Sequence, residues 1–503
     1  MNQLKIGIVL NYVSVAATFV IGLLYTPFLI RTLGQADYGI YALALAIAGY
    51  LSLLDLGIGN AIVRYIAQNQ AIGTKDKEAK LVGYFFKLFS YIGLATLVIG
   101  ISVALNLQNV ISSDFTSEQI ETLQWMILIL TLNFAVGFIL NTFSAVLQAY
   151  EKFIFLKLAN VLRISLTPII SVFYLMFSTN LIVLTVILTV VNSAVLIVSY
   201  FYYKKSLKIK MSFERVQKDL KKEILGYSLV IFVVAIADKL YWQTDQILLG
   251  ILKNPEAVAV FALAIQFVNI FMSLSIAINS VFLPRVTHIV SAENYVNQLN
   301  ALFIKVSKFQ TFVMGLFLSG FVLIGEVFIE LWVGKTFELT YVIVLILMST
   351  FALDLIQNLG LVIMQAKGKY IFRAYTLIIC SILNVLISIP IIKLYGSVGT
   401  AIITAIFVFI GNVLVLNIYY HKKLQLDMLA YWRKIGKLLA IISIVALIGF
   451  GLKGLILVDD WGSLFTYIVV YSTLYCVVIY FTYLSKNEKQ WMLAKVKRLK
   501  NRG

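Results

Sequence analysis

The sequence predicts an all-α integral membrane protein with 14 transmembrane helices and both termini in the cytoplasm. Three observations predict this fold class. Of the 503 residues, 61% are hydrophobic and 13% are charged, whereas soluble domains are about half apolar and a quarter charged. Apolar runs long enough to span a bilayer recur along the chain, and basic residues gather in alternate loops. The runs are continuous rather than alternating, which favours helices over a membrane barrel.

Each predicted span is an apolar run of about 20 residues or more, the length that crosses the hydrocarbon core. The first run follows Lys5 without a small-residue cleavage site, so we expect a retained helix rather than a signal peptide. The runs lie near residues 7–30, 38–62, 81–106, 122–149, 153–178, 181–203, 224–251, 257–284, 303–325, 339–366, 370–392, 398–420, 436–457 and 463–485.

The charges of the loops test this count of spans. Most of the 41 lysines and arginines fall on one side, chiefly in 204–222, 422–437 and 486–502, while acids such as Asp114 and Asp459 collect on the other. The positive-inside rule places the basic side in the cytoplasm, and a wrong count would scramble the alternation. The net charge of +18 therefore sets membrane topology and does not indicate a nucleic-acid partner.

An internal repeat relates the first twelve spans. Asn141, Gln148 and Lys152 recur 217 residues later as Asn358, Gln365 and Lys369. Six spans per repeat is an even number, so we expect two parallel halves around a central path, which favours a carrier over a channel. The predicted parts are an N-terminal six-helix bundle (1–203), a basic cytoplasmic linker (204–223), a C-terminal six-helix bundle (224–421), and two additional helices with a basic cytoplasmic tail (422–503).

Five segments within these spans resemble the polysaccharide (O-antigen type) flippases of the multidrug/oligosaccharidyl-lipid/polysaccharide exporter superfamily. They are Thr26–Gly34 (TPFLIRTLG), Asp37–Tyr41 (DYGIY), Leu54–Gly59 (LDLGIG), Asp245–Gly250 (DQILLG) and Tyr395–Thr404 (YGSVGTAIIT). The resemblance covers spans one to twelve, and 14 spans match the flippase branch. It implies two bundles that flip an undecaprenyl-diphosphate-linked oligosaccharide outward across the cytoplasmic membrane by alternating access, for surface polysaccharide biosynthesis.

Charged side chains inside spans are candidate functional groups because their insertion costs about 2.5–3.5 kcal/mol each. We predict that four carboxylates couple transport to a proton or a sodium ion: Asp55, Asp238, Asp245 and Asp354. In the seventh span, Asp238, Trp242 and Asp245 share one helical face and Lys239 and Gln243 lie on the next stripe. The predicted substrate-binding residues are Lys239, Asp238, Trp242, Gln243, Asp245, Asn141, Asn358 and Gln365. The alternatives are an ion pair of Lys239 that locks the helix, and amides that only join helices.

Arginines end several spans on the basic side. A rim of such guanidinium groups would recruit a diphosphate headgroup through bidentate hydrogen bonds, and the alternative is that they only snorkel to lipid phosphates. The rim comprises Arg64, Arg163, Arg285 and Arg373, with Arg31 on the outer side for gating or release.

Two other functions stay open. A cation-coupled multidrug extrusion antiporter of the same superfamily would suit the buried acids, although that branch usually has 12 spans. A membrane-embedded glycan polymerase or ligase needs polar catalytic groups outside, but the longest outer loop, 107–121, has no Lys, Arg or His. Cys380 and Cys476 lie in apolar runs without metal-ligand spacing, so we expect no metal site. The sequence contains no nucleophile motif or phosphate-binding glycine loop, so we expect neither an enzyme nor a cofactor. The expected partners are the lipid-linked oligosaccharide, membrane lipids, the coupling ion and polysaccharide polymerase machinery.

Overall fold

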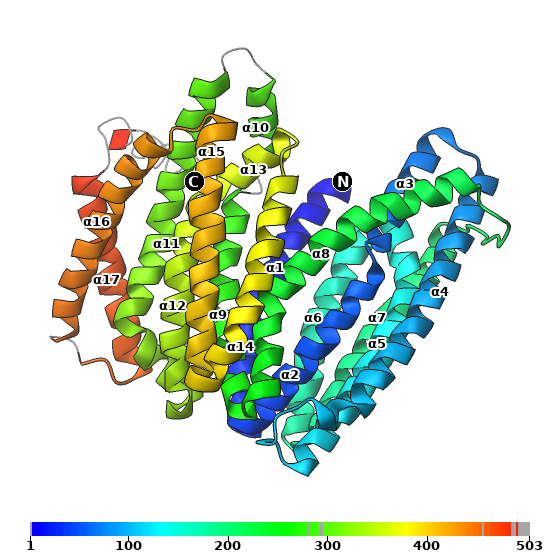
Figure 1. The fold of residues 1–503 in the computed structure, drawn as a ribbon, viewed down its shortest axis with the longest axis horizontal. Coiled ribbons are helices and arrows are strands. Elements are labelled where there is room, and N and C mark those ends of the chain that lie inside the picture. The colour runs from blue at the N-terminus through cyan, green and yellow to red at the C-terminus, as the bar shows by residue number, and fades with distance from the viewer. Residues whose placement is uncertain (1–2, 280–281, 292–294, 455–456, 484–488, 491–503) are drawn as a thin grey trace, which may run out of the picture. The chain divides into compact units, whose positions relative to one another are not determined.

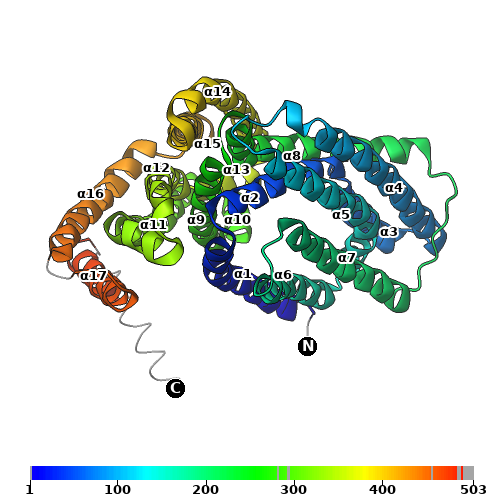
Figure 2. The same ribbon diagram turned by 90° about the horizontal axis from the view of Figure 1, so that it is seen from below.

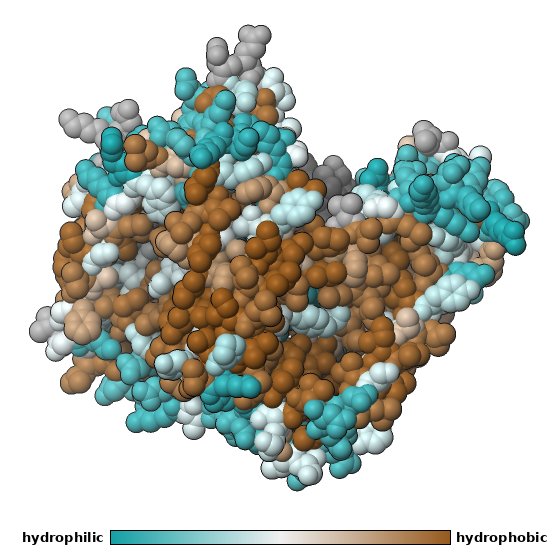
Figure 3. Space-filling model, in the orientation of Figure 1, coloured by the Kyte–Doolittle hydropathy of each residue, from teal (hydrophilic) through white to brown (hydrophobic). Residues whose placement is uncertain are grey.

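The structure, a computed structural model, describes residues 3–279, 282–291, 295–454, 457–483 and 489–490, and every regular element in them is a helix (Figure 1). Twelve helical segments are long and apolar enough to cross a membrane, or thirteen if the bent helix Lys218–Leu252 is one span. In Figure 3, apolar side chains cover the middle of the helices and polar ones gather at their ends. The chain is therefore a multi-pass membrane protein.

The helices form two compact units. Unit 1 comprises Met1–Ala262 with Ile389–Ser397, and unit 2 comprises Leu263–Ser388 with Val398–Gly503. The four-part division predicted from the sequence was based on the internal repeat and the basic linker. These two units were instead defined by contacts between residues, so the four-part division stays a prediction.

In unit 1, helix α5 contacts most of the other helices. Helix α5 lies between α4 and α7, while α1 packs along α6 and α8 packs across α2 and α3 (Figure 2). Aromatic rings such as Phe85, Phe89 and Phe143 fill its core. The elements are α1 (Gln3–Leu33), α2 (Gln35–Leu51), η1 (Ser52–Asp55), α3 (Ile58–Ile72), α4 (Lys75–Leu105), η2 (Leu107–Asn109), α5 (Ser117–Ala149), α6 (Phe153–Leu175), α7 (Leu181–Ser206), α8 (Lys218–Leu252) and the start of α9 (Pro255–Asn279).

The last helix of unit 2 packs on the rest of that unit through a row of tyrosines. Tyr467, Tyr471 and Tyr475 are buried at a spacing of four, and their hydroxyls donate to neighbouring helices over 2.7–2.8 Å. The elements are the rest of α9, α10 (Leu283–Val290), α11 (Tyr295–Val333), η3 (Lys335–Phe337), α12 (Glu338–Leu355), α13 (Leu359–Ala366), most of α14 (Ile371–Val408), the π-helix η4 (Phe409–Val415), α15 (Leu416–Leu424), α16 (Met428–Lys453) and α17 (Trp461–Thr482).

Two predicted spans are interrupted rather than continuous. Span two breaks between α2 and α3, where Leu56 and Gly57 have φ of 50° and 75°. A Cβ on Gly57 would stand 2.7 Å from the Ser228 carbonyl oxygen, so α8 packs directly on this break. Span ten breaks between α12 and α13. An apolar run does not reveal such breaks, because the flanking residues are as hydrophobic as the rest of the helix.

The repeat is visible as an aromatic pair that occurs once in each unit. Phe155 and Tyr202 stack with ring centroids 3.9 Å apart, and Phe372 and Tyr419 stack at 4.0 Å. Both members of the second pair lie 217 residues after the first, the offset found in the sequence. Each pair fixes the start of one helix against the end of another.

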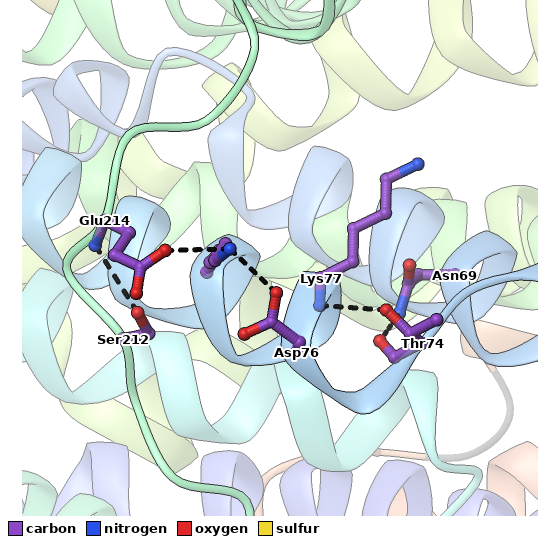
Figure 4. A network of polar contacts seen from close by, with 7 residues as sticks. Asn69, Thr74, Asp76, Lys77, Ser212 and Glu214 are labelled. Carbon is purple, nitrogen blue, oxygen red and sulfur yellow. Dashed lines mark hydrogen bonds and ion pairs between the residues drawn. The ribbon is translucent and has the colours of Figure 1, made fainter.

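The segment 207–217 between α7 and α8 lies against α4 of unit 1. The Ser212 amide donates to the Ala79 carbonyl over 3.0 Å, and Lys80 bridges Asp76 (2.7 Å) and Glu214 (2.8 Å) (Figure 4). A Cβ on Gly83 would stand 2.0 Å from the Ser212 carbonyl oxygen, so a glycine is needed for this approach. The predicted basic linker is thus held along unit 1 by backbone contacts as well as charge.

Candidate functional site

A hollow within unit 1 lies among four helices. It has a volume of about 600 Å³ and is lined by α1, α5, α6 and α7. A proline at position 168 interrupts the hydrogen bonding of α6 on this side. Its polar lining comprises Tyr25, Asn133, Asn141, Arg163, Thr167 and Asn192, and the rest is apolar, including Phe134, Phe138 and Leu188.

A guanidinium group and amides form the polar wall of this cavity. Arg163 donates to Asn160 over 2.8 Å and to Asn192 over 3.4 Å, and Asn192 in turn donates to Asn133 over 2.7 Å. Arg163 remains accessible, and its recorded hydrogen-bond partners in the described structure are neutral. The wall therefore presents a positive charge that its own neighbours do not neutralise, together with amides able to donate and accept.

Asp55, at the break in span two, lies near Asn141, which lines this cavity. Its carboxylate accepts from the Gly59 amide over 3.2 Å. A Cβ on Gly59 would stand 3.5 Å from both Asp55 carboxylate oxygens and 3.8 Å from Asn141 Nδ2. The lack of a side chain at Gly59 thus leaves the acid and the amide facing the same small space. The sequence predicted these two residues for different roles, and the structure brings them together.

The predicted residues of span seven lie on α8, which bends by 43° between Lys218–Ala237 and Lys239–Leu252. Lys239 Nζ donates to Gln243 Oε1 over 3.1 Å, and a Cβ on Gly49 would stand 2.5 Å from that oxygen. Asp245 is buried and Trp242 is half-buried. These residues pack toward α2 and are not among those that line the cavity. The side chain of Asp238 lies outside the described residues.

In unit 2, Asp354 ends a chain of buried hydrogen bonds. Asn412 donates to its carboxylate over 2.9 Å, Gln357 donates to the Asn412 carbonyl over 2.8 Å, and Asn417 donates to Gln357 over 2.8 Å. Trp432 of α16 donates to Asn417 over 2.7 Å. The network therefore connects α16, the first of the two additional C-terminal helices, to Asp354 at the break in span ten.

Sequence reasoning missed four members of this network: Gln357, Asn412, Asn417 and Trp432. Asn412 and Asn417 are five residues apart, so a regular α-helix would turn them to different faces. The π-helix η4 contains Asn412 and ends two residues before Asn417, and its wider i→i+5 turn brings the two amides closer to one face. The available signal was the presence of several amides within an apolar run.

The remaining predicted residues are dispersed. Arg373 is within electrostatic reach of Asp354 and donates to the Tyr370 hydroxyl over 2.9 Å. Arg64 lies over the Tyr227 ring, 4.5 Å from its centroid. Arg31, Arg285 and Gln365 are exposed, and Asn358 is half-buried where α13 begins.

Comparison with known proteins shows the family. A family model described as "Polysaccharide biosynthesis protein" matches residues 4–290, more than half of the chain. The chain belongs to this family. A Shigella flexneri protein named "Putative O-antigen transporter" is 24% identical over 404 residues, covering 78% of this chain and 92% of that protein. The resemblance predicted from the sequence motifs is confirmed.

Solved structures show the same fold. A lipid II flippase MurJ in an inward closed conformation has a TM-score of 0.72 at 16% identity, covering 93% of this chain and 98% of MurJ. An inward-facing multidrug resistance MATE family transporter has a TM-score of 0.61 at 13% identity, covering 82% and 99%. These relatives are transporters or flippases rather than enzymes, and at such low identity the structural likeness establishes the fold alone.

Proposed function

We propose that the chain is a flippase that carries an undecaprenyl-diphosphate-linked oligosaccharide across the cytoplasmic membrane by alternating access, for surface polysaccharide biosynthesis. The observation that supports it is the cavity of unit 1, in which Arg163 lies among asparagines and no carboxylate is part of the described lining. A guanidinium group suits a diphosphate because it binds phosphate oxygens bidentately. Amides, hydroxyls and aromatic rings suit sugars.

The proposed topology has 14 spans with both termini in the cytoplasm. The segment Ile371–Leu424 is 54 residues long, and a helix of that length would extend about 80 Å, far more than a bilayer of about 30 Å. Its backbone turns at Gly396, with φ of 58° and ψ of −140°. The count of thirteen takes this segment as one span, so dividing it into two gives fourteen.

In the proposed cycle, the exposed arginines of the basic side, Arg64 and Arg285, attract the headgroup before it reaches the cavity. Asp55 is the strongest candidate for ion coupling, since it stands at a helix break beside Asn141. Transporters place binding sites at such breaks because the freed backbone groups line polar space. Lys239 and Asp245 on α8 would respond to the same movement through their packing on α2. Polysaccharide polymerase machinery is the proposed downstream partner.

A cation-coupled multidrug antiporter is the second candidate function. Buried Asp245 favours it, because a carboxylate held inside a membrane protein suits a cationic drug or a coupling ion. The similarity of the fold to a multidrug resistance MATE family transporter is compatible with either function. The two functions differ in the sign of the cargo's charge, which can be measured directly.

Binding of the lipid-linked oligosaccharide to purified protein tests the proposed site. Charge-assisted hydrogen bonds are worth about 1.5–3 kcal/mol, so Arg163→Ala is expected to raise Kd roughly 10- to 150-fold. Arg433→Ala, an exposed arginine on α16, is the charge-matched control and is expected to leave Kd unchanged. Equal Kd values for Arg163→Ala and the unmodified chain would remove the cavity from the binding site.

A further inference from the structure

Unit 2 contains a second, unrelated hollow that is rich in lysine. It has a volume of about 470 Å³ and lies where α10, α11, α13 and α15 end or begin. Its polar lining comprises Tyr295, Lys367, Lys369, Lys423 and Gln425, and Val290 and Ala366 complete it. We call it the lysine pocket. It belongs to the end of unit 2 that carries basic loops, and it shares no residue with the proposed cargo site.

Two of the lysines converge on the end of one helix. Lys367 Nζ donates to the Leu424 carbonyl over 3.2 Å, and Lys369 Nζ donates to the adjacent Lys423 carbonyl over 3.1 Å. Helix α15 ends there because Gln425 takes a left-handed conformation, with φ of 61°. Each ammonium has three N–H donors, so one recorded bond apiece leaves most of their donors available. Lys367 Nζ also lies over the Tyr295 ring, 4.6 Å from its centroid.

No carboxylate partner is recorded for these three lysines in the described part of the chain. Asp427, two residues after Gln425, is an acid close to the pocket in the sequence, and its carboxylate instead accepts from the Ala430 amide over 2.9 Å. Glu293, between Val290 and Tyr295 in the sequence, lies outside the described residues. Three neighbouring cations repel one another, and the helix end offers only partial negative charge. A ligand with more than one negative oxygen would therefore stabilise this arrangement.

The internal repeat supplies a control for the turn that carries the lysines. In unit 2 the Lys369 amide donates back to the Met364 carbonyl over 2.8 Å, around Gly368 at φ 65°. In unit 1 the Lys152 amide makes the equivalent bond to Leu147 over 3.0 Å.

The equivalent turn has different side chains. Tyr150 stands in the place of Lys367, and Glu151, at φ 54°, stands in the place of Gly368. Ser206 occupies the position that corresponds to Lys423. The turn can thus form without a group of lysines, so their presence in unit 2 requires another reason.

We propose that the lysine pocket binds a phosphate group at the membrane surface. Basic pockets at the cytoplasmic ends of transmembrane helices bind anionic lipid headgroups, and the same donors would hold soluble phosphate. Lys367 and Lys369 hold the anion from the α13 turn and Lys423 closes it from α15. This site is separate from the cargo cavity, so it stands whether or not the proposed transport function holds.

Native mass spectrometry of the full chain from nanodiscs containing dioleoyl phosphatidylglycerol tests the lipid source. Lys423→Gln is the main variant, because the Lys423 ammonium makes no recorded bond in the described structure and its loss should leave the fold intact. Lys422→Gln, the exposed neighbour outside the lining, is the matched control. A lysine near an anionic surface is worth a factor of about five. We expect about fivefold weaker retention for Lys423→Gln alone and about 100-fold weaker retention when Lys367→Gln and Lys369→Gln are added.

Calorimetric titration with sodium phosphate in lipid-free detergent tests the soluble source, and thermal unfolding in the same detergent checks that each variant is folded. Retained phosphatidylglycerol that falls with Lys423→Gln and not with Lys422→Gln assigns the pocket to a lipid headgroup. Phosphate binding with the same pattern, without retained lipid, assigns it to soluble phosphate. Equal behaviour of the two variants in both measurements, or binding of neither anion, overturns the proposal.

Discussion

Replacing Gly39 by alanine tests the packing that holds α2 in unit 1. A Cβ at this position would stand 1.9 Å from the Pro255 carbonyl oxygen, 2.7 Å from its carbonyl carbon and 3.3 Å from the Ala259 amide nitrogen. These are backbone atoms at the start of α9, so no rotamer change can relieve the overlap. The two backbones would have to separate by about 1 Å, in an interior whose packing resists such shifts.

The cost can be worked from two opposing terms. Overpacking of this kind costs about 1–3 kcal/mol, and the upper end applies because the obstructing atoms belong to the backbone. Alanine regains about 1 kcal/mol of helix propensity over glycine. The net effect is a destabilisation of about 2 kcal/mol, which thermal unfolding in detergent should report as a lower Tm.

Gly226→Ala in α8 provides the matched control. Nothing lies within 4 Å of a Cβ built on that glycine, so only the propensity gain operates and Tm should stay level or rise slightly. If Gly39→Ala melts at or above the temperature of Gly226→Ala, the close approach of α2 to the start of α9 is refuted.

Three further perturbations follow from the contacts. Asn412→Leu removes the donor to the buried Asp354 carboxylate, so it should cost about 1.5–3 kcal/mol in thermal unfolding; a stability equal to the unmodified chain would contradict the network. Lys239→Ala should reduce transport while leaving Tm unchanged. Intact transport would show that Lys239 has no role in substrate binding or transport. Lys80→Gln should change the free energy of unfolding by less than about 1 kcal/mol, because exposed ion pairs contribute little. It should nevertheless speed trypsin cleavage in 207–217, and unchanged cleavage would show that the backbone contacts alone hold the segment.

The helical fold could be predicted because the membrane imposes it. Long apolar runs and alternating basic loops reflect the bilayer itself. The repeat could be recognised because Asn141 and Asn358 have matching neighbours in the sequence. The breaks at Gly57 and after Asp354 could not be found in this way. They depend on backbone conformation and on which helix packs against them, and the hydropathy of the residues predicts neither of these.

The site was only partly predictable for a related reason. The sequence pointed to Arg163 and Asn141 but assigned them to a rim and to a binding face, and their shared cavity depends on how four helices pack. Asn192 and Asn133 were overlooked because single amides in apolar helices are usually packing groups. The Asp354 network was overlooked because its members lie on separate helices, and because the spacing of Asn412 and Asn417 is not that of one face of an α-helix.

Flipping of a fluorescent undecaprenyl-diphosphate oligosaccharide in proteoliposomes tests the central claim most directly. The unmodified chain should move the glycolipid between leaflets, and the rate should fall in Arg163→Ala and stay unchanged in Arg433→Ala. A collapse of ion gradients and membrane potential should slow the same reaction, as the proposed role of Asp55 requires. Expulsion of cationic dyes, with no movement of any lipid-linked glycan, would contradict the account and identify the chain as a drug antiporter.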